Sequence, residues 1–247
     1  MPDECIHGLE AGLCDVCYPK PVPVAVASAT TTTTRTRSTQ PRTAGVGRPD
    51  HKVGEQRIYH VTHMNNLAAI IESDGLLANA TPAVDVSSAE NRAARRETAV
   101  GSAVVADYVP FFLSPNATVW SAIRAQEPDP RLSREIRDLP AAEFIIMVST
   151  VKVASTMDVA VADGDAANTF TSFGTTPETN DRTLRKLRAD EEAILAGELL
   201  VKDSFPFDQL ALIGVANDRA RDAVKEILQL AAHEPKVSVY PPWFARE

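Results

Sequence analysis

The sequence predicts a protein of the α/β or α+β class, built around an aliphatic core. Of the 247 residues, 44% are hydrophobic but only 6% are aromatic. Residues 58–79 read as a short strand followed by a helix. Residues 143–153, which contain Phe-Ile-Ile-Met-Val-Ser-Thr-Val, are typical of a buried strand. No apolar run approaches the roughly 18 residues that a membrane-spanning helix needs, so we expect no membrane association.

The first 19 residues hold all three cysteines of the chain, Cys5, Cys14 and Cys17. Together with His7 they make four ligands of the kind that zinc prefers, and the Cys14–Cys17 spacing is that of a zinc knuckle. The Cys5–His7 spacing is tighter than in common zinc fingers, so reactive or incidental cysteines are the alternative. We expect a structural zinc knuckle over residues 1–19, because so short a segment needs a metal to stay folded.

Residues 20–53 read as a disordered linker. They run through Pro-Val-Pro-Val, a stretch of threonines and scattered arginines, a composition that cannot support a packed core. The formal net charge of −8 excludes a wholly basic nucleic-acid-binding protein but leaves room for a local basic groove. There is no signal-peptide pattern and no cysteine in the main body, so we expect a cytoplasmic protein.

The main domain, residues 54–247, opens with a predicted strand from Ile58 to Thr62, with His60 and His63 at its end. Asn65 reads as the N-cap of a helix, and Gly75 as its C-cap. The helix itself is predicted from apolar residues at helical spacing, Leu67, Ile70 and Ile71. A polar side chain beside the start of a helix suits the binding of a small anionic ligand, and a structural role for His60 is the alternative.

The next elements carry charged and aromatic residues. Residues 88–98 read as a polar helix or loop with Arg92, Arg95 and Arg96, a cluster suited to binding phosphate or carboxylate groups. A solvated helix face is the alternative. Residues 108–115 predict an aromatic β segment, and residues 117–125 predict a helix.

Residues 158–186 read mainly as loop, ending in a short basic helix. A long irregular segment in a compact domain is often functional. Phe170 and Phe173 would either pack this segment down or stack on a nucleobase. A strand over residues 197–202 follows, with Glu198 near its start. The remaining elements are a turn at 205–210, a strand at 210–215, a helix at 218–231 and a strand at 237–240.

His60, Arg95 and Glu198 form the candidate constellation, each expected at or near a strand end. Such a set can hold a dinucleotide: the histidine bonds a ribose, the arginine binds pyrophosphate, and the glutamate stabilises an oxocarbenium-like centre or accepts a proton. Cleavage of a nicotinamide–ribose bond requires orientation and a nearby carboxylate, and no metal. For Glu198 alone, an ordinary exposed strand-end carboxylate is the alternative.

From Tyr59 onward the sequence resembles the DarT family, the DNA ADP-ribosyltransferase toxins of DarTG toxin–antitoxin systems. The matching pieces are Tyr-His-Val-Thr-His-x-x-Asn-Leu at 59–67, Gly-Leu-Leu-Ala at 75–78, the arginines at 92–96 with Val100, Asp-Tyr-Val-Pro-Phe-Phe at 107–112, and Glu-Leu-Leu-Val at 198–201 with Phe205-Pro206. They occur in the family's order, and their specificity comes from the combination.

The resemblance implies an α+β fold of the ADP-ribosyltransferase type, related to poly-ADP-ribose polymerases, with a split mixed β-sheet and flanking helices. It implies NAD-dependent transfer of ADP-ribose to a thymine or guanine of single-stranded DNA. Glu198 and Arg95 would be catalytic, with Arg92 and Arg96 as alternatives to Arg95. Residues 158–197 would contact the DNA, and a macrodomain (DarG-like) antitoxin would be the partner. The implied NAD contacts are His60, Val61, Thr62, Ala69, Leu77 and Arg95.

The sequence departs from the family pattern at several positions. Ala106 stands where a histidine is usual, Phe112 where a tyrosine is usual, and Asn168 or Thr169 where the substrate loop often has a histidine. These departures leave the modified base open. The competing interpretations are an ADP-ribosyltransferase for RNA or protein, and a catalytically silent NAD- or nucleic-acid-binding module. The joint presence of His60, Arg95 and Glu198 counts against the silent module.

Overall fold

The computed structural model describes residues 53–246. The expected zinc ligands Cys5, His7, Cys14 and Cys17 and nearly all of the expected linker lie outside these residues. Within them, an eight-stranded sheet has the strand order β12-β11-β6-β1-β5-β9-β7-β8, and the pairs β10–β2 and β3–β4 stand apart from it. The sheet is mixed, because β11 and β12 are parallel while the other neighbours are antiparallel. The predicted α+β class is confirmed.

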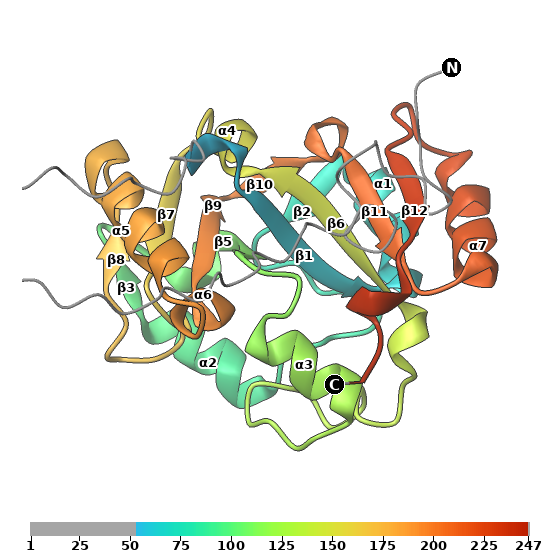
Figure 1. The fold of residues 1–247 in the computed structure, drawn as a ribbon, viewed down its shortest axis with the longest axis horizontal. Coiled ribbons are helices and arrows are strands. Elements are labelled where there is room, and N and C mark those ends of the chain that lie inside the picture. Colours follow the sequence, from blue (N-terminus) through green and yellow to red (C-terminus); the bar gives the residue numbers. More distant parts are fainter. Residues whose placement is uncertain (1–52, 247) are drawn as a thin grey trace, which may run out of the picture. The chain divides into compact units, whose positions relative to one another are not determined.

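Helices flank this sheet at both ends, α7 beside β12 and β11, and α5 beside β7 and β8 (Figure 1). No helix in residues 53–246 is long and apolar enough to cross a membrane. The strands are β1 (Arg57–His63), β2 (Gly75–Leu77), β3 (Ala99–Val100), β4 (Ala103–Val104), β5 (Tyr108–Phe112), β6 (Phe144–Thr150), β7 (Val159–Ala162), β8 (Phe173–Gly174), β9 (Glu198–Lys202), β10 (Ser204–Pro206), β11 (Leu212–Val215) and β12 (Lys236–Val239). The α-helices are α1 (Leu67–Glu72), α2 (Ala89–Glu97), α3 (Thr118–Ala125), α4 (Val151–Ala154), α5 (Pro177–Ala189), α6 (Ala193–Ala196) and α7 (Asp218–Leu228).

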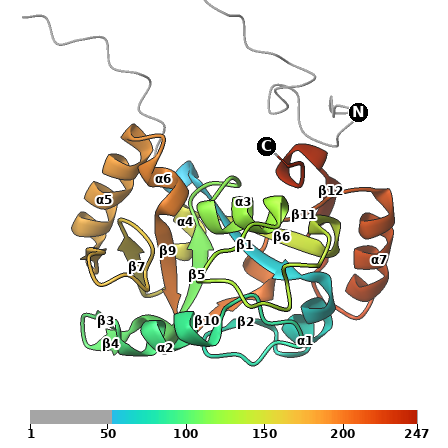
Figure 2. The ribbon, with the colours of Figure 1, turned by 90° about the horizontal axis from the view of Figure 1, so that it is seen from below.

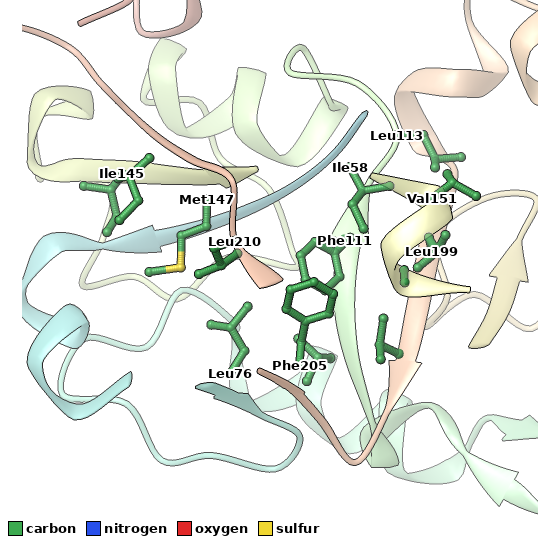
Figure 3. Close-up of a cluster of buried hydrophobic side chains, with 14 of the residues drawn as sticks. Ile58, Leu76, Phe111, Leu113, Ile145, Met147, Val151, Leu199, Phe205 and Leu210 are labelled. Carbon is green, nitrogen blue, oxygen red and sulfur yellow. The ribbon is translucent and has the colours of Figure 1, made fainter. Parts of the chain in front are cut away.

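Strand β6 is the centre of the core, as its apolar sequence predicted. Successive side chains of a strand point to opposite faces, and here both faces are covered. Ile145 and Met147 pack into one apolar cluster with Phe111 and Phe205, whose rings lie 4.8 Å apart (Figure 3). Phe144, Ile146 and Val148 pack into a second cluster, around Trp120, on the other face.

The predicted strand and helix of residues 58–79 are confirmed, but both predicted caps are wrong. Asn65 does not cap with its side chain; instead its backbone N–H donates to Nδ1 of His63 at 3.2 Å. His63 also contacts Glu143 through Nε2 at 3.3 Å, so this buried ring connects two segments. Helix α1 ends at Glu72 with Ser73 as its C-cap, and Asp74 takes the left-handed conformation expected of Gly75. Gly75 instead begins β2, where a Cβ would lie 2.4 Å from the Phe205 carbonyl oxygen.

Residues 158–186 are more regular than predicted. Val159–Ala162 form β7, which pairs with β9, and the segment expected as a loop at 174–180 contains the start of α5. Thr176 caps α5 and Pro177 occupies its first turn, the placement that favours helix entry. The predicted basic helix is therefore the second half of a 13-residue helix. Near the C-terminus, α7 ends at Leu228 rather than at residue 231.

Candidate active site

A cleft of about 730 Å³ opens where the sheet divides. Strands β1 and β5 are neighbours but pair only at Tyr59 and Phe112, whereas β1 pairs with β6 along its full length. Residues of both strands near this single pair, among them His60 and Pro110, line the cleft. Every position in residues 53–246 that was expected to contact NAD or to catalyse lines this cleft, namely His60, Val61, Thr62, Ala69, Leu77, Arg95 and Glu198.

His60 bridges the divide between the two strands. Its Nδ1 lies 2.9 Å from the carbonyl oxygen of Pro110 on β5. Because a carbonyl only accepts, Nδ1 carries the proton and Nε2 is the acceptor of the neutral ring. Burial lowers the pKa of His60, and the hydrogen bond to Pro110 opposes part of that shift. The ring therefore presents a hydrogen-bond acceptor to the cleft near neutral pH, as a ribose hydroxyl requires. It does so from the middle of β1, not from the strand end that was expected.

Glu198 is the first residue of β9, opposite Phe112 on one side and Ala162 on the other. The exposed-carboxylate alternative is wrong, because the residue is only 4% exposed. Its Oε1 accepts a hydrogen bond from the backbone N–H of Ala166 at 2.9 Å. Its Oε2 accepts one from Arg95 Nη1 at 3.1 Å. Donors on both oxygens fix the orientation of this carboxylate in the wall of the cleft.

Arg95 comes from the last turn of α2, which crosses below the ends of β5 and β9 in Figure 2. The polar helix or loop expected at residues 88–98 is thus a helix, and Arg95 lies in its last turn, shortly before β3. Ser88 caps this helix, its Oγ accepting from the N–H of Asn91 at 3.0 Å and donating to the Pro130 carbonyl at 2.7 Å. Within the described residues, Nη2 of Arg95 is buried without a hydrogen-bond partner. Buried donors are nearly always paired, so this atom fits an acceptor on a ligand such as a phosphate or ribose oxygen.

The other two arginines of α2 have different surroundings. Arg92 forms an ion pair with Asp85 and donates from Nη1 to the Ser87 carbonyl at 3.2 Å. Arg96 lines the cleft from an exposed position. Among the described residues, Arg95 is the one arginine of these three that contacts Glu198. The cluster therefore divides into one arginine bound to the buried carboxylate and two at the margin.

Sequence reasoning gave no role to two residues of this cleft, although Asn66 stands in the motif at 59–67. Asn66 is buried and joins Val84 to β1: its Nδ2 donates to the Val84 carbonyl at 2.8 Å and to Thr62 Oγ1 at 3.0 Å, and its Oδ1 accepts from the Val84 N–H at 2.9 Å. Arg131 lines the cleft, bonded to Asp129 and 3.8 Å from Asp165. An asparagine just before an apolar helical repeat was a usable signal for Asn66, although it also suits a simple cap. An arginine in an irregular segment gave no signal.

Comparison with known proteins shows which family the chain belongs to. Residues 59–245 match the family described as ssDNA thymidine ADP-ribosyltransferase, DarT. The chain belongs to the DarT family. A DNA ADP-ribosyl transferase of Thermus aquaticus is 28% identical over 210 residues, covering 77% of this chain and 89% of the relative.

Solved DarT structures share the fold. Thermus sp. 2.9 DarT in complex with ADP-ribosylated ssDNA has a TM-score of 0.65 at 22% identity, covering 77% of this chain and 96% of the other. The same protein in complex with NAD+ gives a TM-score of 0.61 at 21% identity, covering 77% and 98%. Thermosipho africanus DarTG in complex with ADP-ribose gives 0.59 at 15% identity, covering 76% of this chain and 51% of that one. The expected sheet of the ADP-ribosyltransferase type is thereby confirmed.

Metal ligands do not gather in the described DarT domain. Residues 53–246 contain no group of three or more His, Cys, Asp or Glu side chains that could hold a metal ion. The groups available to a ligand in this cleft are instead an imidazole acceptor, a guanidinium donor and a buried carboxylate. These suit a phosphorylated, ribose-containing molecule.

Proposed function

We propose that this DarT-family chain is an enzyme that transfers ADP-ribose from NAD to a thymine of single-stranded DNA. The observation that carries the proposal is the pair of the largely buried Arg95 with the buried Glu198 in the wall of a cleft that also contains His60. A volume of about 730 Å³ falls in the range of small-molecule sites, about 300–1,000 Å³. The match to the ssDNA thymidine ADP-ribosyltransferase family supports the choice of substrate.

NAD fits the groups that line the cleft. His60 offers an acceptor to a ribose hydroxyl, and Arg95 offers the partnerless Nη2 to a phosphate or ribose oxygen. Ala69 and Leu77 supply apolar surface for the base or the nicotinamide ring. Val61 and Thr62, which follow His60 on β1, contribute backbone and side-chain contacts to the same cleft. NAD would thus be held with its reacting ribose near Glu198.

In the reaction the bond between nicotinamide and the ribose breaks, and its electron pair leaves with nicotinamide. The ribose carbon becomes positively charged, and the Glu198 carboxylate stabilises that charge. A thymine nucleotide carries one ring N–H, at N3, which must lose its proton before this nitrogen can form the new bond to the ribose. Glu198 is placed to accept that proton. In duplex DNA the N3–H is engaged in base pairing, which accounts for a single-stranded substrate.

The test is to incubate the purified full-length chain with NAD and single-stranded oligonucleotides that contain or lack thymine. We expect a mass gain of one ADP-ribose only on oligonucleotides with thymine, together with release of nicotinamide. The Glu198→Ala variant should bind NAD but produce no gain. Modification of guanine instead of thymine would show that the proposed target base is wrong. Labelling of RNA or protein with none on DNA would contradict the proposal.

We further propose that the chain acts in the cytoplasm as the toxin of a toxin–antitoxin pair, with a macrodomain protein that removes ADP-ribose as its partner. The likeness to Thermosipho africanus DarTG supports this. Expression in a bacterial host should stop growth, and Glu198→Ala should abolish that effect. Co-expression of a macrodomain that hydrolyses DNA ADP-ribosylation should restore growth. Growth arrest that is equal for the Glu198→Ala variant would contradict the proposal.

For the N-terminal part we propose a zinc knuckle over residues 1–19, with Cys5, His7, Cys14 and Cys17 as ligands, joined by a linker at 20–53 to the catalytic domain at 54–247. Four protein ligands complete a tetrahedral zinc site, so this site would be structural. Metal analysis of the purified chain should find zinc, and Cys14→Ser should remove most of it. Equal zinc content in both proteins would contradict the ligand assignment.

A further inference from the structure

Phe170 is the most exposed large hydrophobic residue of the described chain, at 93%. Phe173, three residues later, is partly buried and packs beside Val105, Leu200 and their neighbours. From the sequence, each of these aromatic residues could either pack against the domain or stack on a nucleobase. In the structure the two residues have different surroundings. Phe173 belongs to β8 and the core, whereas Phe170 contributes nothing to either.

The loop that presents Phe170 is held by its own hydrogen bonds. At its base, the Asp163 N–H donates to the Ser172 carbonyl at 3.1 Å, and Asp163 Oδ1 accepts from the Ser172 N–H at 2.8 Å. Near the tip, the Phe170 N–H donates to Asn168 Oδ1 at 2.9 Å. The Thr171 hydroxyl donates to the Asp165 carbonyl at 2.6 Å. These bonds fix the backbone on both sides of Phe170, so its exposure is built into the loop.

The same loop holds the carboxylate of the proposed active site. The Ala166 N–H donates to Glu198 Oε1 at 2.9 Å, and Ala166 itself is fully buried. Phe170 lies four positions further on, which places its Cα within about 14 Å of the Ala166 Cα even for an extended chain. A DNA strand with one base at Glu198 would therefore bring its neighbouring bases within reach of the Phe170 ring.

We propose that Phe170 stacks on a nucleobase next to the one that is modified, and so binds the flanking DNA. This inference rests on the proposed function. Every nucleobase has an aromatic face, so a phenyl ring stacks on unpaired bases with little sequence preference. An unpaired strand can turn a base toward the ring, whereas a duplex keeps its bases stacked on each other. Lys186, with a 76% exposed side chain 3.8 Å from Asp163, adds a cation beside the loop for a phosphate.

A solitary exposed apolar residue is ordinary on a protein surface. Leu230 is such a residue, 78% exposed just after α7. Phe170 differs because its loop is held by hydrogen bonds of its own, and because Ala166 of the same loop donates a hydrogen bond to Glu198. Leu230→Ala therefore removes a comparable exposed side chain away from the cleft and serves as the matched control.

The experiment measures kcat/KM for single-stranded oligonucleotides that contain one thymine, with the full-length chain and its variants. We expect Phe170→Ala to lower kcat/KM for DNA on the order of tenfold, Phe170→Trp to retain it, and Leu230→Ala to leave it unchanged. The Kd for NAD, measured without DNA, should be equal in all four proteins. A loss of NAD binding in Phe170→Ala would mean that the loop and Glu198 had moved, and it would overturn the inference.

A second series identifies the base that is stacked. Oligonucleotides with an abasic site at each position beside the thymine remove one base face at a time. We expect one abasic position to lower kcat/KM of the wild type about as much as Phe170→Ala does, and to lower the variant no further. Equal penalties in wild type and variant at every position, or full activity of Phe170→Ala, would overturn the inference. A wild type that modifies no DNA would instead refute the proposed function, and the inference with it.

Discussion

Arg95 and Glu198 are separated by 103 positions in the chain, yet Nη1 of the arginine lies 3.1 Å from Oε2 of the glutamate. The side chains are 14% and 6% exposed, so water screens the pair weakly. One comes from the last turn of a helix and the other from the first residue of a strand. The pair joins the α2 side of the cleft to the sheet and places a fixed carboxylate beside an arginine that still has a donor to offer.

Removal of the charge on Glu198 should abolish most of the transfer reaction. Glu198→Gln keeps the shape of the side chain but cannot accept a proton or stabilise a cationic ribose. Positioned acid–base groups contribute about 10²–10⁴-fold to rate, so we expect kcat for DNA ADP-ribosylation to fall by at least about 10²-fold. Glu97→Gln, on the exposed side of α2, is the matched control and should retain full activity. A Glu198→Gln enzyme within a few-fold of wild type would exclude Glu198 from the chemistry.

The interaction between Arg95 and Glu198 should also be measurable in the free energy of unfolding, without any substrate. Among the described residues, Arg95→Met leaves the buried Glu198 carboxylate with only the Ala166 N–H as a hydrogen-bond donor. Breaking a buried ion pair from one side is costly, so we expect the free energy of unfolding to fall by about 2–4 kcal/mol. Adding Glu198→Gln to this variant removes the stranded charge and should restore part of the loss. Urea unfolding of the two single variants and the double variant measures the coupling. Strictly additive effects would show that the two residues do not interact.

His60 gives the cleft a pH dependence of defined sign. Burial lowers the pKa of His60 below the ordinary value of about 6.5, so the imidazole stays neutral at neutral pH. The KM for NAD should therefore be flat above about pH 6.5 and rise only at lower pH, where protonation removes the Nε2 acceptor. The unfolded chain takes up this proton first as the pH falls. The His60 contribution to stability is therefore complete above the unfolded pKa and decreases below it.

The control for this prediction is His60→Gln, whose amide can donate to the Pro110 carbonyl and still offer an oxygen, but does not titrate. Its KM for NAD should lack the rise at low pH that His60 causes. His60→Ala should raise KM about three- to tenfold at neutral pH, the value of one hydrogen bond, and by less at low pH, where the protonated wild-type ring has lost the same acceptor. An unchanged low-pH rise in His60→Gln would assign the titration to another group.

The sequence predicted most of this fold because its signals were local. The apolar run within residues 143–153 was typical of a buried strand, and the spacing of Leu67, Ile70 and Ile71 indicated α1. The elements it misplaced depend on distant partners. Val159–Ala162 are short and become a strand by pairing with β9, and Gly75 is required by the Phe205 carbonyl on another strand. The residue types suggested His60, Arg95 and Glu198, and the resemblance to DarT supported the same three positions, but neither indicated the hydrogen bonds that hold them.

Gly75 should tolerate no side chain, for a reason unrelated to helix capping. A Cβ there would lie 2.4 Å from the Phe205 carbonyl oxygen and 3.1 Å from the Pro206 Cα. Gly75→Ala should separate β2 from β10 and lower the free energy of unfolding by about 1–3 kcal/mol. Since Leu76 and Leu77 line the cleft, NAD binding should weaken as well. Gly54→Ala, whose Cβ would meet Lys152 no closer than 3.4 Å, is the control and should behave as wild type. Equal denaturation midpoints for both variants would contradict the close approach.

Asn66 and Asn65 are neighbours in sequence but should respond differently to substitution. Asn66 is buried, and its amide bonds to Thr62 Oγ1 at 3.0 Å and to both backbone groups of Val84. Asn66→Ala should cost about 1–3 kcal/mol, because it strands the buried groups that it satisfied. It should also release residues 78–82, which line the cleft, so that KM for NAD rises while kcat changes little. Asn65→Ala should leave stability and KM unchanged, since the exposed Asn65 uses only its backbone N–H toward His63. Thermal unfolding and steady-state kinetics of the two variants test this prediction. An equal loss of stability and an equal rise in KM in Asn65→Ala would contradict the role assigned to Asn66.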